Sequence, residues 1–236
     1  DWTYKTGSVH HLFHWPSGGF VGVDVFFVIS GFLITSLLLR EHEKTGTISF
    51  WGFYRRRIKR IIPAAAIVII FTVFVAWFAF NQLRFFRTFW DGIYATFFVA
   101  NWHFAAEGTD YFQSGGPVSP LQHYWSLSVE EQFYFIWPWL MLLLFWIVSR
   151  ARGARRHALG AVLTAITIIT AASFIWSLWE TSTSTTWAYF STLSRAWELG
   201  VGALIAVGAA AFVTMPSWLR TAAAWVGLAG ISFSLF

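Results

Sequence analysis

The sequence contains no cysteine and few charged residues. Without cysteine the chain can form no disulfide, and it has no thiolate for nucleophilic chemistry or for a metal site. Charged residues make up 11% of the 236 residues, whereas an average soluble domain carries about 25%. This leaves too little polar surface to cover a water-soluble globule. The composition therefore excludes an ordinary soluble enzyme and also a disordered chain.

Apolar and aromatic residues are abundant instead. Hydrophobic residues account for 57% of the chain and aromatic residues for 21%, and the mean hydropathy is +0.58. This is the composition of an integral membrane protein. The net charge of +5 is typical of the basic cytoplasmic loops of such a protein and indicates no nucleic-acid partner.

Apolar stretches of about 20 residues, the length that crosses a bilayer, recur along the chain. They predict an all-α fold, a polytopic transmembrane helix bundle. The predicted spans are residues 18–39, 61–80, 132–149, 158–179, 199–219 and 221–236. The last span is shorter than a ~30 Å hydrocarbon core requires, and residues 1–16 do not have the pattern of a signal peptide. We therefore expect residues 1–236 to be a partial membrane domain from a longer protein.

The positions of lysine and arginine give the orientation. These residues concentrate in loops 40–60 and 150–157, which are therefore expected on the cytoplasmic side. Residues 81–131 then have both ends outside. Within them, the apolar stretch 93–105 is too short for an ordinary span and predicts a re-entrant helix or a short span.

Charged residues near the outer ends of the predicted spans are candidates for function, because charge inside a membrane is costly. Asp24 lies within the first span, and Glu130 and Glu131 directly precede the third. The other candidates are Arg195, Glu198 and a cluster of histidines, His10, His11 and His14. Together these groups could perform general acid–base chemistry in one layer.

These candidates also have structural interpretations. The two adjacent glutamates suit the positive end of a helix dipole, with Ser126 or Ser128 as the cap. Arg195 and Glu198 are three residues apart and can pair with each other. An aspartate within a span needs a partner or a wet cavity. The histidine cluster predicts no metal site, because Pro16 ends any helix there and no HExxH motif is present.

The segment FYRRRIKRIIP, residues 53–63, is basic and amphipathic. It suits an anchor on anionic lipid. It also suits a clamp for the phosphates of a cytoplasmic ligand, because arginine forks match phosphate oxygens. Taken by itself, the segment favours the anchor, since such segments are common beside membrane spans.

Four segments carry a family resemblance when they are taken in order. They are GGFVGVDVFFVISGFLIT (residues 18–35), FYRRRIKRIIP (53–63), HYWSLSVEEQFY (123–134) and, more weakly, RAWEL (195–199). In this order they closely resemble the bacterial acyltransferase-3 family of polytopic membrane O-acyltransferases. The resemblance extends from about residue 10 to the end of the chain.

The resemblance implies that the protein moves an acyl group, usually acetyl, from cytoplasmic acyl-CoA to a hydroxyl. The acceptor would be an envelope glycan, a lipid or a secreted small molecule. Acyl-CoA would be the donor substrate, and the protein would hold no tightly bound cofactor. The resemblance also implies a multi-pass protein of the cell membrane. Many members carry a C-terminal SGNH-type domain outside the cytoplasm, which would follow Phe236.

Catalytic residues are implied in the same way. His11 best matches the essential histidine of the family, with His10 and His14 as its neighbours. We expect it to act as the base or as a transient acyl carrier, with Glu130 or Glu131 orienting the imidazole. The family also places an arginine in a hydrophobic helix before this histidine. Residues 1–9 here are polar, so that helix is expected to be missing from this chain.

The basic motif of the family maps onto Arg57 and Arg60, with Arg56 adjacent, and would hold the CoA phosphates. If the histidine lies outside and the arginines inside, ~30 Å of bilayer separates them. The pantetheine arm would then thread a cavity between the helices. The residues expected to line or support this cavity are Asp24, His123, Arg195 and Glu198.

Two other functions fit parts of the sequence. A transporter or flippase of an envelope precursor would also use carboxylates within the membrane and broken helices. No inverted repeat is visible, however, and the basic motif lies in a cytoplasmic loop. The third alternative is a non-catalytic anchor or partner of another enzyme.

Overall fold

The computed structural model describes residues 21–108, 118–150 and 158–234, which are helical with no strand among them. The predicted all-α fold is confirmed. The helices are α1 (Val21–Thr45), α2 (Phe50–Ala79), α3 (Gln82–Thr96), α4 (Ala100–Ala106), α5 (Tyr124–Arg150), α6 (Ala158–Thr183), α7 (Thr185–Phe190), α8 (Thr192–Val207), α9 (Ala209–Thr214) and α10 (Ser217–Ser234). Among them α1, α2, α5 and residues Leu159–Thr183 of α6 are long and apolar enough to cross a membrane. The chain is a multi-pass membrane protein.

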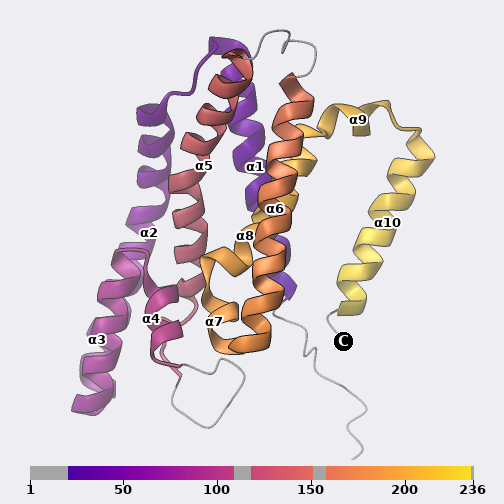
Figure 1. Ribbon diagram of the computed structural model, residues 1–236. Helices are drawn as coiled ribbons and strands as arrows, with labels where there is room; N and C mark the ends of the chain where they lie inside the picture. The colour runs from indigo at the N-terminus through magenta and orange to yellow at the C-terminus, as the bar shows by residue number, and fades with distance from the viewer. Residues whose placement is uncertain (1–20, 109–117, 151–157, 235–236) are drawn as a thin grey trace, which may run out of the picture.

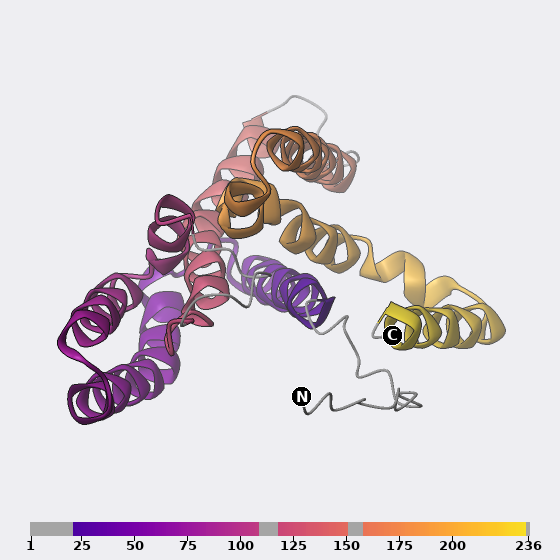
Figure 2. The same cartoon turned by 90° about the horizontal axis from the view of Figure 1, so that it is seen from below.

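The long helices stand side by side (Figure 1). In this view α1, α5 and α8 run in one direction and α2 and α6 in the other, as the charged loops require. The connection between α1 and α2 lies at the upper end, while α3, α4 and α7 lie at the lower end. Seen from below, α1 and α5 are central, α2 and α3 lie to one side, and α10 stands apart on the other (Figure 2).

Glycines allow α1 and α8 to pack backbone against backbone. A Cβ on Gly31 would meet the carbonyl oxygen of Leu199, and a Cβ on Gly202 would meet that of Val28. Small residues at such contacts are the usual means by which membrane helices associate closely. The α1–α8 pair, which also carries Asp24 and Glu198, is therefore fixed by its glycines.

Helices α3 and α4 form a hairpin that leaves and returns to the same end of the molecule. They are separated by a turn at residues 97–99, where Phe98 adopts a φ of 55°. That value lies in the left-handed region, which ends a helix. Residues 93–105 are therefore not one helix, and the entry of this hairpin into a bilayer stays a prediction.

Two helices begin earlier than the predicted spans, and they include the charged residues that bounded the apolar stretches in the sequence. Residues 61–80 belong to α2, which begins at Phe50, and residues 132–149 belong to α5, which begins at Tyr124. The basic motif and both adjacent glutamates are thus helical, one or two turns inside. Charged residues end a predicted apolar segment, but a helix can continue through them when other residues of the fold pair with the charges.

The predicted span 199–219 is wrong as a single helix. Helix α8 begins earlier and ends at Val207, followed by Gly208, and Pro216 separates α9 from α10. Glycine and proline are the residues that most disfavour a helix interior. The predicted terminal span 221–236 falls mainly in α10, whose described side chains are exposed.

Candidate functional site

A pocket of about 440 Å³ lies between α2, the α3–α4 turn and α5. One wall is apolar, and the other carries charged and hydroxyl groups. The residues that line it are Tyr54, Arg57, Phe97, Phe98, Val99, Glu131, Gln132, Tyr134, Phe135 and Ile136. The pocket therefore joins the basic motif of α2 to the acidic motif of α5.

The charged pair in this pocket is Arg57 and Glu131. Arg57 Nη1 donates to Glu131 Oε1 at 3.3 Å, and both side chains are partly buried. The guanidinium also stacks over the Tyr134 ring, with Cζ 3.1 Å from the ring centroid. Such a cation–π contact stabilises a desolvated arginine. The pair places a positive and a negative group side by side at the pocket wall.

The antiparallel packing of α2 and α5 explains how the two motifs meet. Tyr54 donates to the carbonyl oxygen of Phe135 at 2.8 Å. Further along α2, the carbonyl oxygen of Ala65 accepts from Tyr124 at 2.9 Å. Arg57 falls between these contacts and lies about 10 Å inside its helix, as Glu131 does from the opposite end. The two long side chains cover the remaining distance, whereas the expected ~30 Å separation between His11 and the arginines stays a prediction, because His11 lies outside the described residues.

Gln132 holds the apolar turn against α5. Its Nε2 donates to the Phe98 carbonyl at 2.8 Å and to Asn101 Oδ1 at 2.9 Å. Its Oε1 accepts from Trp102 Nε1 at 3.1 Å and from Thr192 Oγ1 at 2.5 Å. The sequence prediction overlooked this residue, although it directly follows the two glutamates. Because one amide fixes the α3–α4 turn to two helices, it sets the shape of the pocket.

Glu130 points away from the pocket and toward α1. Its Oε1 accepts from Ser30 Oγ at 2.5 Å and also from the Tyr134 hydroxyl. Adjacent residues on a helix point about 100° apart, so the two glutamates contact different helices. Neither lies in the first turn of α5, and Ser128 donates to the Tyr124 carbonyl at 2.9 Å. The interpretation of these acids and serines as helix-start and capping residues is therefore wrong.

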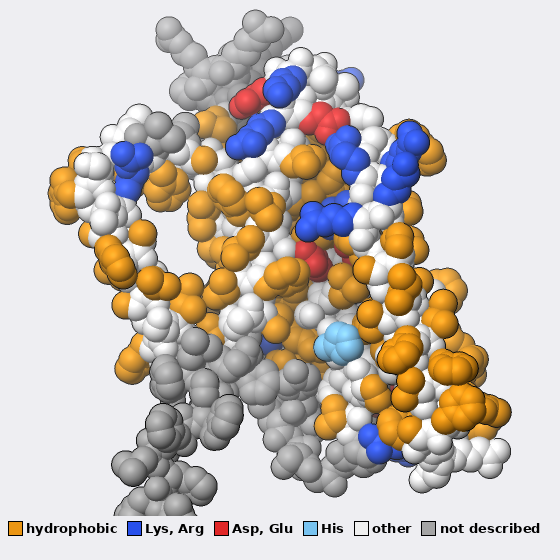
Figure 3. All heavy atoms as spheres, turned by 180° about the vertical axis from the view of Figure 1, so that it is seen from behind, with side chains coloured by type: hydrophobic (Ala, Val, Ile, Leu, Met, Phe, Trp, Pro, Cys, Tyr) orange, Lys and Arg blue, Asp and Glu red, His pale blue; other side chains and the backbone are white. Residues whose placement is uncertain are grey.

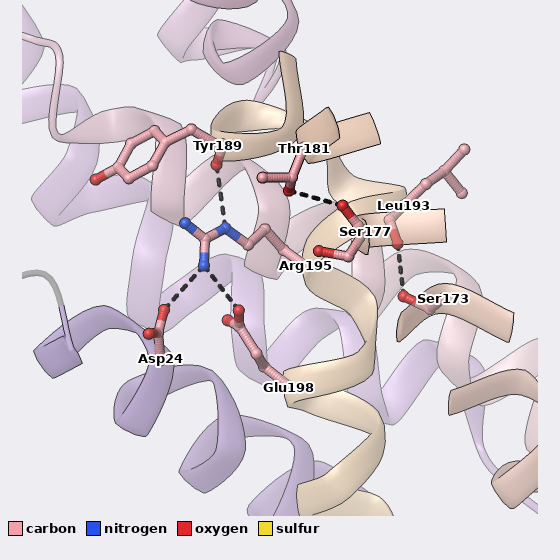
Figure 4. A network of polar contacts seen from close by, with 8 residues as sticks. All are labelled: Asp24, Ser173, Ser177, Thr181, Tyr189, Leu193, Arg195 and Glu198. Carbon is pink, nitrogen blue, oxygen red and sulfur yellow. Dashed lines mark hydrogen bonds and ion pairs between the residues drawn. The ribbon is translucent and has the colours of Figure 1, made fainter. Parts of the chain in front are cut away.

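A second polar cluster joins α1, α7 and α8 around Arg195 (Figure 4). Arg195 Nη1 lies 2.9 Å from Asp24 Oδ1 and 2.8 Å from Glu198 Oε1, and its Nε donates to the Tyr189 carbonyl at 3.1 Å. Arg195 and Glu198 do pair, but Asp24 of a different helix shares the arginine. This is the partner that a carboxylate within a span requires.

Glu198 is the most buried carboxylate of this cluster. Its side chain is 1% exposed, and its Oε2 has no hydrogen-bond partner among the described residues. A buried charge without compensation is strongly destabilising. Arg195 is thus essential to the α1–α8 contact, and the cluster lies apart from the residues that line the pocket.

The remaining predicted site residues do not enter the pocket. Arg56 is 59% exposed and turns to Glu41 of α1, 3.6 Å away, and Arg60 is exposed. His123 precedes α5, and partial burial lowers the pKa of its imidazole below the ordinary value. His10, His11 and His14 lie outside the described residues.

Basic side chains gather where the α1–α2 connection lies. On the face seen in Figure 3, Lys and Arg side chains crowd the upper end, and acidic side chains lie among and below them. Chemically, the pocket can hold an anionic or polar group against Arg57 and an apolar group against Phe97 and Phe98. Tyr54 and Tyr134 also line the pocket, and their hydroxyls donate to the Phe135 carbonyl and to Glu130.

The sequence model of a family described as an acyltransferase domain matches residues 2–236. YrhL of Bacillus subtilis (strain 168), provisionally named a peptidoglycan O-acetyltransferase, is 39% identical over 85% of this chain and 30% of its own length. The peptidoglycan O-acetyltransferase OatA of Listeria monocytogenes is 36% identical over 84% of this chain and 31% of its own length.

A protein of Staphylococcus aureus (strain COL), provisionally named an O-acetyltransferase, is 37% identical over 84% of this chain and 32% of its own length. The chain thus spans about a third of the length of the curated relatives that it matches. No solved structure matches it.

Proposed function

This chain belongs to the acyltransferase-3 family, and from that premise we propose that it moves an acetyl group from acetyl-CoA to a hydroxyl of a cell-envelope glycan. Peptidoglycan is the favoured acceptor, because two relatives bear that name. The donor would bind from the cytoplasm and the product would form outside. The protein would therefore work in the cell membrane, and acyl-CoA would be a substrate, not a resident cofactor.

The observation that carries this proposal is the meeting of Arg57 and Glu131 in one pocket. An arginine from the basic end lies 3.3 Å from a carboxylate of α5. The pocket beside them has an aromatic wall. An acyl-CoA donor needs a cationic contact for the phosphates of its CoA and a path for the pantetheine arm that carries the thioester. The exposed Arg56 and Arg60 would meet the phosphates first, and Arg57 would hold the part that enters the pocket.

The reaction breaks the thioester C–S bond and forms an ester C–O bond. The acceptor hydroxyl loses its proton to a base, and the CoA sulfur leaves as a thiolate that is then protonated. His11 is the proposed base or transient acyl carrier. Glu131, which lines the pocket, is the better candidate of the two glutamates to orient or balance the charge of a histidine. Glu130 is the better candidate for holding α1 against α5.

The test is acetyl transfer by the full-length protein in membrane vesicles supplied with labelled acetyl-CoA. Label should enter the peptidoglycan fraction and disappear for His11→Ala. Arg57→Ala should slow transfer about 10- to 100-fold, because hydrogen bonds to charged groups contribute about 1.5–3 kcal/mol. Arg55→Ala is the matched control, since Arg55 is exposed and lines no part of the pocket.

Different failures would have different meanings. Equal rates for Arg57→Ala and Arg55→Ala would refute the role of the pocket and favour a lipid anchor for the basic segment. Label in a lipid fraction would show that the acceptor is a lipid and not a glycan. If correctly inserted wild-type protein transferred no label, acetyl-CoA would not be the donor. The transporter alternative would then be favoured.

A further inference from the structure

A cluster of three potential metal ligands lies on the α3–α4 hairpin, apart from the pocket. Asp91 belongs to α3, His103 to α4, and Glu107 ends α4. One ligand atom from each residue lies within 4.8 Å of the other two. His103 and Glu107 are four residues apart and so share one helix face. No sequence motif indicates this site, because only the hairpin turn brings Asp91 to the other two residues.

The distances suit ligands that share one cation. His103 Nε2 lies 3.0 Å from Asp91 Oδ1 and 3.6 Å from Glu107 Oε1. Ligands of a zinc ion with bonds of about 2.1 Å lie about 3.0–3.4 Å apart, depending on the coordination number. Oxygen and imidazole ligands are also the types that zinc takes from Asp, Glu and His.

Neighbouring groups orient two of these ligands. Ser119 Oγ donates to Asp91 Oδ2 at 2.6 Å, which leaves Oδ1 toward the histidine. The Tyr94 ring stacks on His103 with centroids 4.0 Å apart and fixes the plane of the imidazole. Hydrogen bonds from outside the ligand set are typical of metal centres, where they align the ligands. Ser119 lies in the segment before α5, so these contacts join that segment to the hairpin.

The site is buried on one side and accessible on the other. The Asp91 side chain is 5% exposed, whereas that of Glu107 is 50% exposed. A cation can therefore enter beside Glu107 and retain water in its remaining positions. Two carboxylates balance its two positive charges, which allows a partly buried site without excess charge.

We propose that Asp91, His103 and Glu107 bind one divalent cation of the zinc type, which clamps α3 to α4. His103 Nε2 and Asp91 Oδ1 are within hydrogen-bonding distance of each other, and the cation would bind between them when Nδ1 carries the imidazole hydrogen. The turn of the same hairpin supplies Phe97, Phe98 and Val99 to the pocket. The cation would therefore rigidify one pocket wall from a distance, without taking part in acyl transfer.

The probes are Zn²⁺ and Co²⁺, added to the purified full-length protein in detergent after chelator treatment. Zinc binding is measured by calorimetry, and bound Co²⁺ by its visible absorption. Wild type should bind one metal ion per protein at this site, and Glu107→Gln and His103→Gln should not bind it. Ser119→Ala should bind about 10- to 100-fold more weakly, as is usual for groups that orient a ligand. Zn²⁺ should also raise the unfolding temperature of wild type, but not of Glu107→Gln.

Two control variants make the result decisive. His42→Gln replaces a histidine that stacks on Phe145 at the opposite end, and it should keep the bound metal ion. A variant with His10, His11 and His14 changed to Gln should keep it as well. The proposal is overturned if Glu107→Gln and His103→Gln bind like wild type. It is equally overturned if only the triple histidine variant loses binding. Because Glu107 is half exposed, its variant should fold normally.

Discussion

At the scale of single residues, neighbouring positions in one motif have different tasks. Glu130 accepts two hydroxyl hydrogen bonds and fastens α5 to α1, whereas Glu131 pairs with Arg57 at the pocket. Arg56 and Arg57 diverge in the same way, one toward Glu41 and the other into the pocket. A motif therefore mixes residues that hold the fold with residues available for chemistry.

Changing each glutamate to glutamine should separate these tasks. Glu130→Gln replaces the acceptor of Ser30 and Tyr134 by an amide, which should cost about 1–3 kcal/mol of unfolding free energy. The unfolding temperature should fall by about 2–4 °C for each kcal/mol. Glu131→Gln should unfold near the wild-type temperature but transfer acetyl at least about tenfold more slowly. Thermal unfolding in detergent and the transfer assay measure the two effects.

The reverse pattern would contradict the assignment. If Glu131→Gln lost stability while Glu130→Gln lost only activity, Glu130 would be the acid that serves the reaction.

At the scale of helices, the close contacts depend on glycines, which have no side chain to keep the helices apart. Gly31 and Gly202 let α1 and α8 touch through their backbones, and Gly200 faces Thr170 of α6. The charged cluster of Asp24, Arg195 and Glu198 crosses the same interface. The glycines thus bring the helices near enough for the arginine to bridge two carboxylates.

A methyl group added at this contact should destabilise the protein. In Gly31→Ala the new Cβ meets a backbone carbonyl that cannot turn aside, so α1 and α8 must separate. Overpacking of this kind typically costs about 1–3 kcal/mol, and we expect a lower unfolding temperature. Gly227→Ala is the matched control, because among the described residues no atom outside its own helix backbone lies within 4 Å of a Cβ there. That variant should equal or slightly exceed wild type, since alanine favours a helix.

Equal unfolding temperatures for the two alanine variants would show that the α1–α8 contact is looser than the glycine positions indicate.

At the scale of the whole molecule, the alternation of helix directions places the two pocket motifs at opposite helix ends. The basic segment enters from the end with the α1–α2 connection, and the acidic segment enters from the other. Their meeting between α2 and α5 places Arg57 and Glu131 in one pocket. The relatives are about three times longer than the matched region, so the complete activity concerns the full-length protein.

The absence of cysteine from these 236 residues gives a direct test of this orientation. Single cysteines at Lys44 and Ser182, both exposed and on opposite ends, should react differently with a membrane-impermeant maleimide. In intact spheroplasts Ser182→Cys should be labelled, and Lys44→Cys should be labelled only after permeabilisation, because basic loops stay in the cytoplasm. The parent protein without the added cysteine is the control. Labelling of Lys44→Cys in intact spheroplasts would invert the topology and the proposed donor side.

The sequence by itself determined the fold class, the membrane character and the family. These follow from composition, from apolar runs and from four ordered motifs, all of which are local or additive properties. It also identified Asp24 and Glu131 as unusual, because charge inside a span is costly, and it identified Arg57 through the basic motif of the family resemblance. The sequence did not predict the ends of α2, α5 and α8. Charged residues lower the local hydropathy as loop residues do, even where the fold pairs them within a helix.

Only the tertiary structure decided which of these residues meet. Arg57 and Glu131 are 74 positions apart, and Asp24 and Arg195 are 171 apart. Their contacts depend on the register of α2 against α5 and of α1 against α8. The hairpin turn at Phe98 likewise brings Asp91 to His103. A register is set by packing along the whole length of two helices, so a one-turn shift of about 5.4 Å would break each pair.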